Sequence, residues 1–95
     1  MEDYVFIYFH ALPGDYALGD IEDDLDDLLQ GTTGRVTGSG MGMEGGNIDI
    51  EFEADADVLP KVIYYLTSCG FDGETILDIN GERRKLSEII KQNEG

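Results

Sequence analysis

The stretch IDIEFE, residues 48–53, alternates strictly between apolar and acidic side chains. Because successive side chains of a β-strand point to opposite faces of its sheet, this period of two predicts a strand with one buried face and one solvent-facing, negative face. Residues 35–43, RVTGSGMGM, are expected to pair with it as a second strand, in which alternate glycines mark a bulge or a close backbone approach. The intervening EGGN, residues 44–47, is the expected hairpin turn.

A further strand and an acidic helix precede this hairpin. Residues 4–10, YVFIYFH, are mostly β-branched and aromatic, and both faces of the strand that they predict are largely apolar. This pattern favours either a central strand covered on both sides or a strand whose second face is used for binding. Residues 20–30 place apolar side chains at helical spacing, with Asp20 as the expected N-cap and Gly31 as the stop. Acidic residues fill the rest of that helix surface.

A second helix is predicted after the central hairpin. Residues 54–57 are expected to cap it, with Asp55 or Asp57 as the N-cap. An apolar stripe at helical spacing follows, and Gly70 is expected to end the helix because glycine readily adopts the left-handed conformation found there.

The C-terminal part predicts one more hairpin and a short helix. Asn80-Gly81 is a strong signal for a two-residue turn, so residues 75–79 and 82–85 are expected to pair as strands. Ser87 is expected to cap a short terminal helix.

The order strand, helix, strand, strand, helix, strand is that of the split βαβ plan. Since both crossover connections should be right-handed, both helices are expected on the same face of the sheet. The sequence therefore predicts one α+β domain over residues 1–95. Its fold would be a ferredoxin-like βαββαβ two-layer sandwich, a four-stranded antiparallel sheet with two helices on one face, plus a C-terminal hairpin strand and short helix.

The chain is strongly acidic. It has 95 residues, with 6 Lys+Arg against 21 Asp+Glu, so its formal net charge is −15. Residues 1–60 hold 15 of these acids and a single base, Arg35. This balance argues against direct binding of nucleic acid or of an anionic membrane surface. The chain shows no apolar run long enough for a membrane span and no signal-peptide pattern, and its single Cys suits a reducing compartment, so we expect a cytoplasmic protein.

Residues for catalysis or metal binding are scarce. The single His, His10, and the single Cys, Cys69, have no nucleophile-elbow or zinc-ligand context. No segment fits the twelve-residue calcium loop, and the glycines of residues 38–42 lack the Lys-Ser/Thr of a phosphate-binding loop. We therefore expect no enzyme activity, no cofactor and no metal.

The surplus of carboxylates exceeds the net charge of about 2–8 that solubility asks of a small domain, which favours electrostatic recognition of a basic protein. Such a surface would combine acids of the first helix and of the central strand with aromatic side chains of the first strand as anchors. The candidate partner-binding residues are Asp23, Asp24, Asp26, Asp27, Asp49, Glu51, Glu53, Tyr4, Phe6 and Tyr8.

Residues 34–66 resemble a type of small acidic bacterial protein. The shared features are a glycine-rich strand, a turn, the strand-to-helix stretch IDIEFEADAD and an apolar helix that contains Pro60. Proteins of this appearance have a ferredoxin-like shape, are often encoded beside secreted toxins and resemble immunity proteins. The resemblance implies no particular site residues.

The composition and the resemblance together lead to one main hypothesis. The chain would be an immunity protein, acting as monomer or homodimer, that neutralises a cognate basic toxin, nuclease-like or nucleic-acid-modifying, by occluding its surface. Two alternatives stay open: a nucleic-acid mimic that inhibits a DNA-binding protein, and a regulatory domain that binds a small molecule near residues 38–42. A further possibility is that the acidic surface serves only solubility, and then none of these three functions would apply.

Overall fold

The computed structural model describes residues 2–94 and shows an α+β fold, as predicted. Five strands form one antiparallel sheet in the order β2-β3-β1-β4-β5. The strands are β1 (Asp3–Phe9), β2 (Arg35–Gly42), β3 (Gly45–Phe52), β4 (Ile76–Ile79) and β5 (Glu82–Lys85). The helices are α1 (Leu18–Leu28), α2 (Val58–Cys69) and α3 (Leu86–Glu94).

The sheet has five strands, where four and an added hairpin strand were expected. β5 pairs with β4 along its whole length and so becomes an edge of the same sheet. The turn between them explains this pairing, because Asn80 and Gly81 both have positive φ, 52° and 92°. Turns of that kind match the twist of the two strands that they join and hold the strands together.

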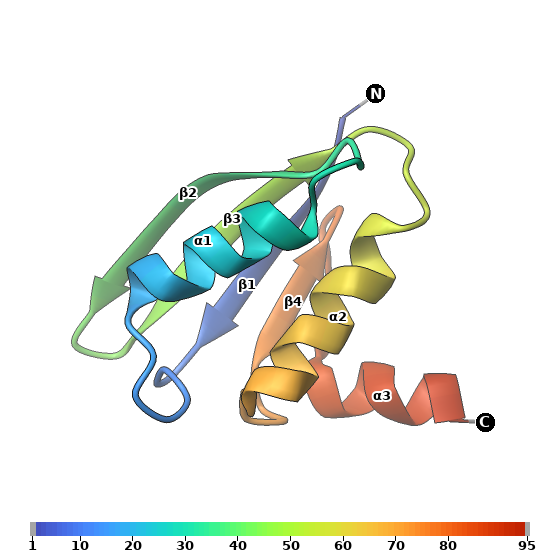
Figure 1. Cartoon of the computed structure of the whole chain (residues 1–95). Coiled ribbons are helices and arrows are strands. Elements are labelled where there is room, and N and C mark those ends of the chain that lie inside the picture. The colour runs from blue at the N-terminus through green and yellow to red at the C-terminus, as the bar shows by residue number, and fades with distance from the viewer. Residues whose placement is uncertain (1, 95) are drawn as a thin grey trace.

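The core lies between the sheet and the helices. Helices α1 and α2 lie on the same side of the sheet (Figure 1), and we call the opposite side the open face. β1 runs through the centre, where Ile7 is opposite Ile48 of β3 and Leu77 of β4, and all three side chains are fully buried. α3 adds Leu86 and Ile89 to the same core. The predicted central position of the first strand is therefore confirmed.

Three local predictions were wrong in position. α1 begins at Leu18, so Asp20 is not the N-cap; its carboxylate accepts a hydrogen bond from the Ala17 N–H from within the first turn. α3 begins at Leu86, one residue before the predicted cap Ser87. The central hairpin turns at residues 43–44, because the glycines at 45 and 46 extend β3 rather than the turn.

Asp55 fixes the entry to α2. Its two carboxylate oxygens accept hydrogen bonds from the N–H groups of Thr33 and Asp57, both at 3.0 Å. These two bonds lower the pKa of the Asp55 carboxyl from its ordinary value of 3.8, and the bond from Thr33 has the larger effect. A group whose pKa is lower in the folded state stabilises the fold above its ordinary pKa and loses that contribution as pH falls through the lowered value.

Replacing Asp55 with asparagine tests this arrangement. We expect Asp55→Asn to lower the free energy of unfolding at pH 7, because one of the two N–H groups loses its acceptor. The difference from the parent chain should shrink as pH falls below 3.8, where the parent carboxyl also takes up its proton. Urea titrations between pH 7 and pH 2 measure this, with Asp57→Asn as the control for charge removed at the same helix end. A difference that stays constant over the range would contradict the role of the carboxylate.

Candidate functional site

The first candidate surface is the outer side of α1. Six of its eleven residues are acidic and none is basic. Asp24 turns toward α2 and accepts a hydrogen bond of 2.8 Å from the Tyr65 hydroxyl, whereas Asp26 turns toward β2 and accepts one of 3.4 Å from the Val36 N–H. Asp23 and Asp27, one helical turn apart, are exposed, and no hydrogen bond or ion pair to their carboxylates is found among the described side chains.

Tyr65 and Asp24 connect α1 to α2. Burial is the main reason that the pKa of Tyr65 is raised far above its ordinary value, and the nearby Cys69 and Asp24 raise it further. The hydroxyl therefore keeps its proton at physiological pH and donates a hydrogen bond to the Asp24 carboxylate. This contact positions the acidic helix and leaves Asp24 less available to a partner than Asp23 or Asp27.

The basic residues neutralise acids elsewhere. Ion pairs of the described residues join Arg35 to Glu2, Arg83 to Asp78, Arg84 to Glu82 and Lys85 to Glu74. None of these pairs involves an acid of α1. The nearby Lys61 donates to the Leu28 carbonyl at the C-terminal end of that helix. Among the described acids that have no ion pair, the six of α1 form the largest group on a single element.

The second candidate surface is the open face of the sheet. Tyr4, Phe6 and Tyr8 of β1 are half-buried there, and the rings of Tyr4 and Phe6 lie 4.5 Å apart. The guanidinium of Arg83 from β5 lies 5.1 Å from the centre of the Tyr8 ring, a cation–π contact. The aromatic residues thus have a basic neighbour from the chain itself, which the spacing of residues along the sequence did not indicate.

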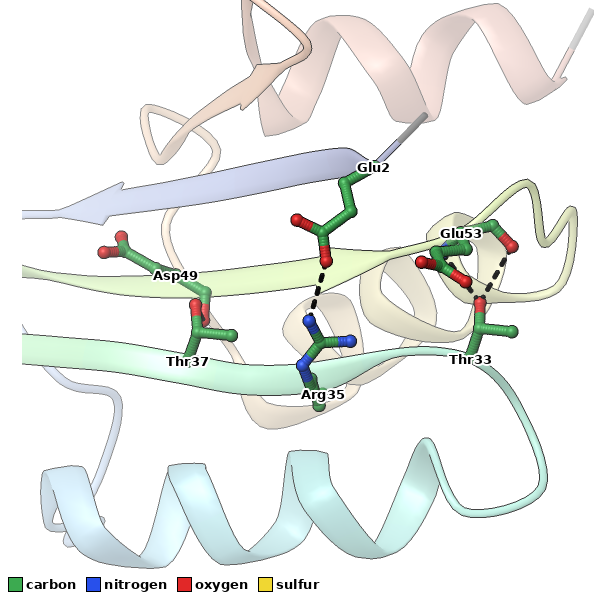
Figure 2. Close-up of polar contacts among 6 residues, drawn as sticks. All are labelled: Glu2, Thr33, Arg35, Thr37, Asp49 and Glu53. Atoms are coloured by element: carbon green, nitrogen blue, oxygen red, sulfur yellow. Dashed lines mark hydrogen bonds and ion pairs between the residues drawn. The ribbon is translucent and has the colours of Figure 1, made fainter.

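The acids of the open face come from β3. Asp49 and Glu51 are half-buried and Glu53 is exposed. Figure 2 shows Asp49 beside Thr37, which donates to its carbonyl, and Thr33 bonded to the main chain of Glu53. These threonines hold β3 against β2 and the segment before it.

Arg35 brings a positive charge into this acidic region. Its guanidinium lies 2.8 Å from a Glu2 carboxylate oxygen (Figure 2). This hydrogen bond lowers the pKa of the Glu2 carboxyl and raises that of Arg35, to which Glu51 and Glu53 also contribute. The open face is therefore mixed in charge, with Arg35 at one side and Arg83 at the other.

The structure does not join the predicted acids into one patch. Asp23, Asp24, Asp26 and Asp27 belong to the helix side. The acids of β3 alternate with its buried apolar residues and lie opposite Tyr4 and Phe6, so they belong to the open face. Both predicted groups of carboxylates are exposed or half-exposed, but their placement on opposite sides of the sheet was not predicted. A flat partner surface would cover one group or the other. Both groups reach the outermost strand β2, where Asp26 accepts a hydrogen bond from the Val36 N–H and the Asp49 carboxylate lies beside Gly38.

A hollow of about 820 Å³ lies at the end of β1, beside the central hairpin. It is lined by Tyr8, His10, Asn47 and Glu74 together with hairpin residues 42–46. It borders the position where a small-molecule site was hypothesised, although only Gly42 of residues 38–42 lines it. The hollow is broad and open, and it holds no cluster of charged groups that would fix a small ligand.

Comparisons with known proteins found no family, no curated protein and no solved structure that matches this chain. Among the side chains that the structure describes, no three or more of His, Cys, Asp or Glu are grouped so that they could hold a metal ion. In the described part of the chain, no helix has the length and apolar character needed to cross a membrane.

Proposed function

We propose that this chain is an inhibitor that binds a positively charged protein, in the manner of a cytoplasmic immunity protein that blocks a toxin. The observation that carries the proposal is the location of the uncompensated charge. Six carboxylates lie on α1 with no ion pair to them among the described residues, although bases elsewhere in the chain pair with four other acids.

Keeping these carboxylates together has a cost. Like charges on one helix repel each other and destabilise the folded state, and Asp is a mediocre helix former. A helix that served only as a cover for the sheet would be more stable with lysines interspersed. A field of one sign has a use in association, because it raises the rate of encounter with an oppositely charged protein to about 10⁸–10⁹ M⁻¹s⁻¹ at low salt.

A nuclease-like or nucleic-acid-modifying toxin would supply such a partner. Proteins that bind nucleic acid neutralise phosphates with clustered Lys and Arg side chains, which form a basic surface. An acidic protein that covers that surface would prevent the nucleic acid from reaching it. We further propose that the first six elements form a ferredoxin-like unit to which β5 and α3 are added, and the strand order β2-β3-β1-β4 supports this.

Co-expression tests the proposed function. Genes that flank the gene of this chain would be expressed singly in a bacterial host, with and without the chain. We expect one flanking product to arrest growth and the chain to restore it. If no flanking product is both toxic and neutralised by the chain, the immunity proposal is wrong.

Charge reversal tests the surface. We expect Asp23→Lys with Asp27→Lys to lower the association rate with the purified partner about tenfold at low salt, because both positions are exposed on α1. The control Glu44→Lys with Glu88→Lys makes the same change in net charge at exposed positions outside α1 and should alter the rate less than twofold. Stopped-flow measurements at 20 and 200 mM salt compare the two variants. Equal rates for the two variants would exclude α1 as the binding surface.

A further inference from the structure

The two edges of the sheet are protected unequally against pairing with another strand. β5 has four residues, Glu-Arg-Arg-Lys, and charged side chains on a short edge strand discourage such pairing. β2 has eight residues, and after Arg35 it contains neither a charged residue nor a proline. An edge of this kind is a template for a further strand.

The main chain of β2 is available along most of that edge. Gly42 and Gly45 close the hairpin, so the alternate residues Met41 and Ser39 direct their N–H and C=O groups away from β3. The bulge between Val36 and Gly38 lies near the start of the strand and leaves the later residues in regular register. Among the described residues, no hydrogen bond from outside the β2–β3 pair reaches the main chain of residues 37–42.

Acidic groups flank this edge on both sides of the sheet. On the helix side, Asp26 of α1 already accepts a hydrogen bond from the outward N–H of Val36. On the open face, a Cβ atom built at Gly38 would lie 3.3 Å from a carboxylate oxygen of Asp49, so that carboxylate lies over the glycine. A strand added beside β2 would send alternate side chains to these two sides.

We propose that the free edge of β2 binds an extended segment of the basic partner, which becomes a sixth strand of the sheet and directs Lys or Arg side chains to both sides. This inference rests on the proposed function and names how the partner binds. Arg35 is an internal example of a basic side chain bound on the open face, because its guanidinium pairs with the Glu2 carboxylate at 2.8 Å. A second copy of this chain fits poorly, since antiparallel pairing of two β2 edges would bring two acidic α1 helices together.

Two peptides test the edge directly. The first is the end-blocked peptide KKVTVTKK, and the second is the same peptide N-methylated at its four central residues, which keeps the charge but cannot pair as a strand. We expect the unmodified peptide to bind at least tenfold more tightly in calorimetry. We also expect it to slow hydrogen exchange at the amides of Ser39 and Met41 at least tenfold. Equal affinities, unchanged exchange or no binding of either peptide would overturn the proposal.

A pair of variants separates this inference from the proposed function. Ser39→Pro removes an outward N–H, whereas Ser39→Ala keeps it, so only the proline variant should bind the unmodified peptide about tenfold more weakly. An amide spectrum of each variant checks the fold, and if the proline variant does not fold, the two peptides decide alone. If Ser39→Pro still neutralises the toxin while reversal of Asp23 and Asp27 does not, the proposed function stands and the β2 edge is excluded.

Discussion

Replacing Ile7 with alanine is expected to lower the free energy of unfolding by about 4 kcal/mol, near the upper part of the range for buried large-to-small substitutions. Ile7 is fully buried in the central strand, with Ile48 on one side and Leu77 on the other. Strands on both sides and helices above leave little freedom for the neighbours to move into the space that the truncated side chain vacates. Since small domains have a total stability of about 5–15 kcal/mol, the variant should be close to unfolding.

Two other variants calibrate this result. Ile7→Val should cost about 1 kcal/mol, because it removes one methylene from the same site. Tyr64→Ala, at an exposed position of α2, should change stability by less than about 0.5 kcal/mol. Urea denaturation measures all three. A loss below about 2 kcal/mol for Ile7→Ala would mean that β1 is not the packed centre of the sheet.

Replacing Gly45 with alanine is expected to cost about 3 kcal/mol or more, the scale of severe backbone strain. Gly45 has φ of 129°, which residues with a Cβ atom rarely adopt, and a Cβ there would collide with the carbonyl oxygen of Phe9. That oxygen belongs to the main chain of the central strand, so it cannot move without disturbing the β1–β3 pairing.

The matched control lies directly across the hairpin. Gly42 does not have the positive φ of Gly45. The atom nearest to a Cβ built at Gly42 is the Gly45 carbonyl oxygen, at 3.9 Å. Gly42→Ala should therefore change stability by less than about 1 kcal/mol. Thermal unfolding of the two variants provides the comparison. Similar melting temperatures would show that the close approach of β1 to Gly45 is not retained in solution.

The fold was largely predictable because its decisive signals are local. Three such signals each involve only a few residues and appear in the structure as predicted. They are the alternation in residues 48–53, the Asn80-Gly81 turn and the left-handed Gly70 at the end of α2. Helix starts were less predictable, since Asp20 can stabilise a first turn either as the N-cap or from within it. The pairing of β5 with β4 was predicted from the Asn80-Gly81 turn, and the structure makes β5 an edge of the same five-stranded sheet.

The candidate site was less predictable than the fold. Which residues are acidic and exposed can be read from the sequence, as Asp23 and Asp27 show. Whether α1 and β3 share a surface depends on which side of the sheet each group faces, and here they face opposite sides. The cation–π contact of Arg83 with Tyr8 joins residues 75 positions apart (83 − 8 = 75) across an intervening strand, and no local pattern reports such a contact.

The placement of charge across the sheet gives the molecule a permanent dipole moment. α1 lies beside β2 at one edge, while Arg83, Arg84 and Lys85 form most of β5 at the other edge. Four spacings between neighbouring strands separate these edges by roughly 19 Å. In the field of a cationic protein the molecule would experience a torque that turns α1 and β2 forward before contact, so a larger share of collisions would begin in one orientation.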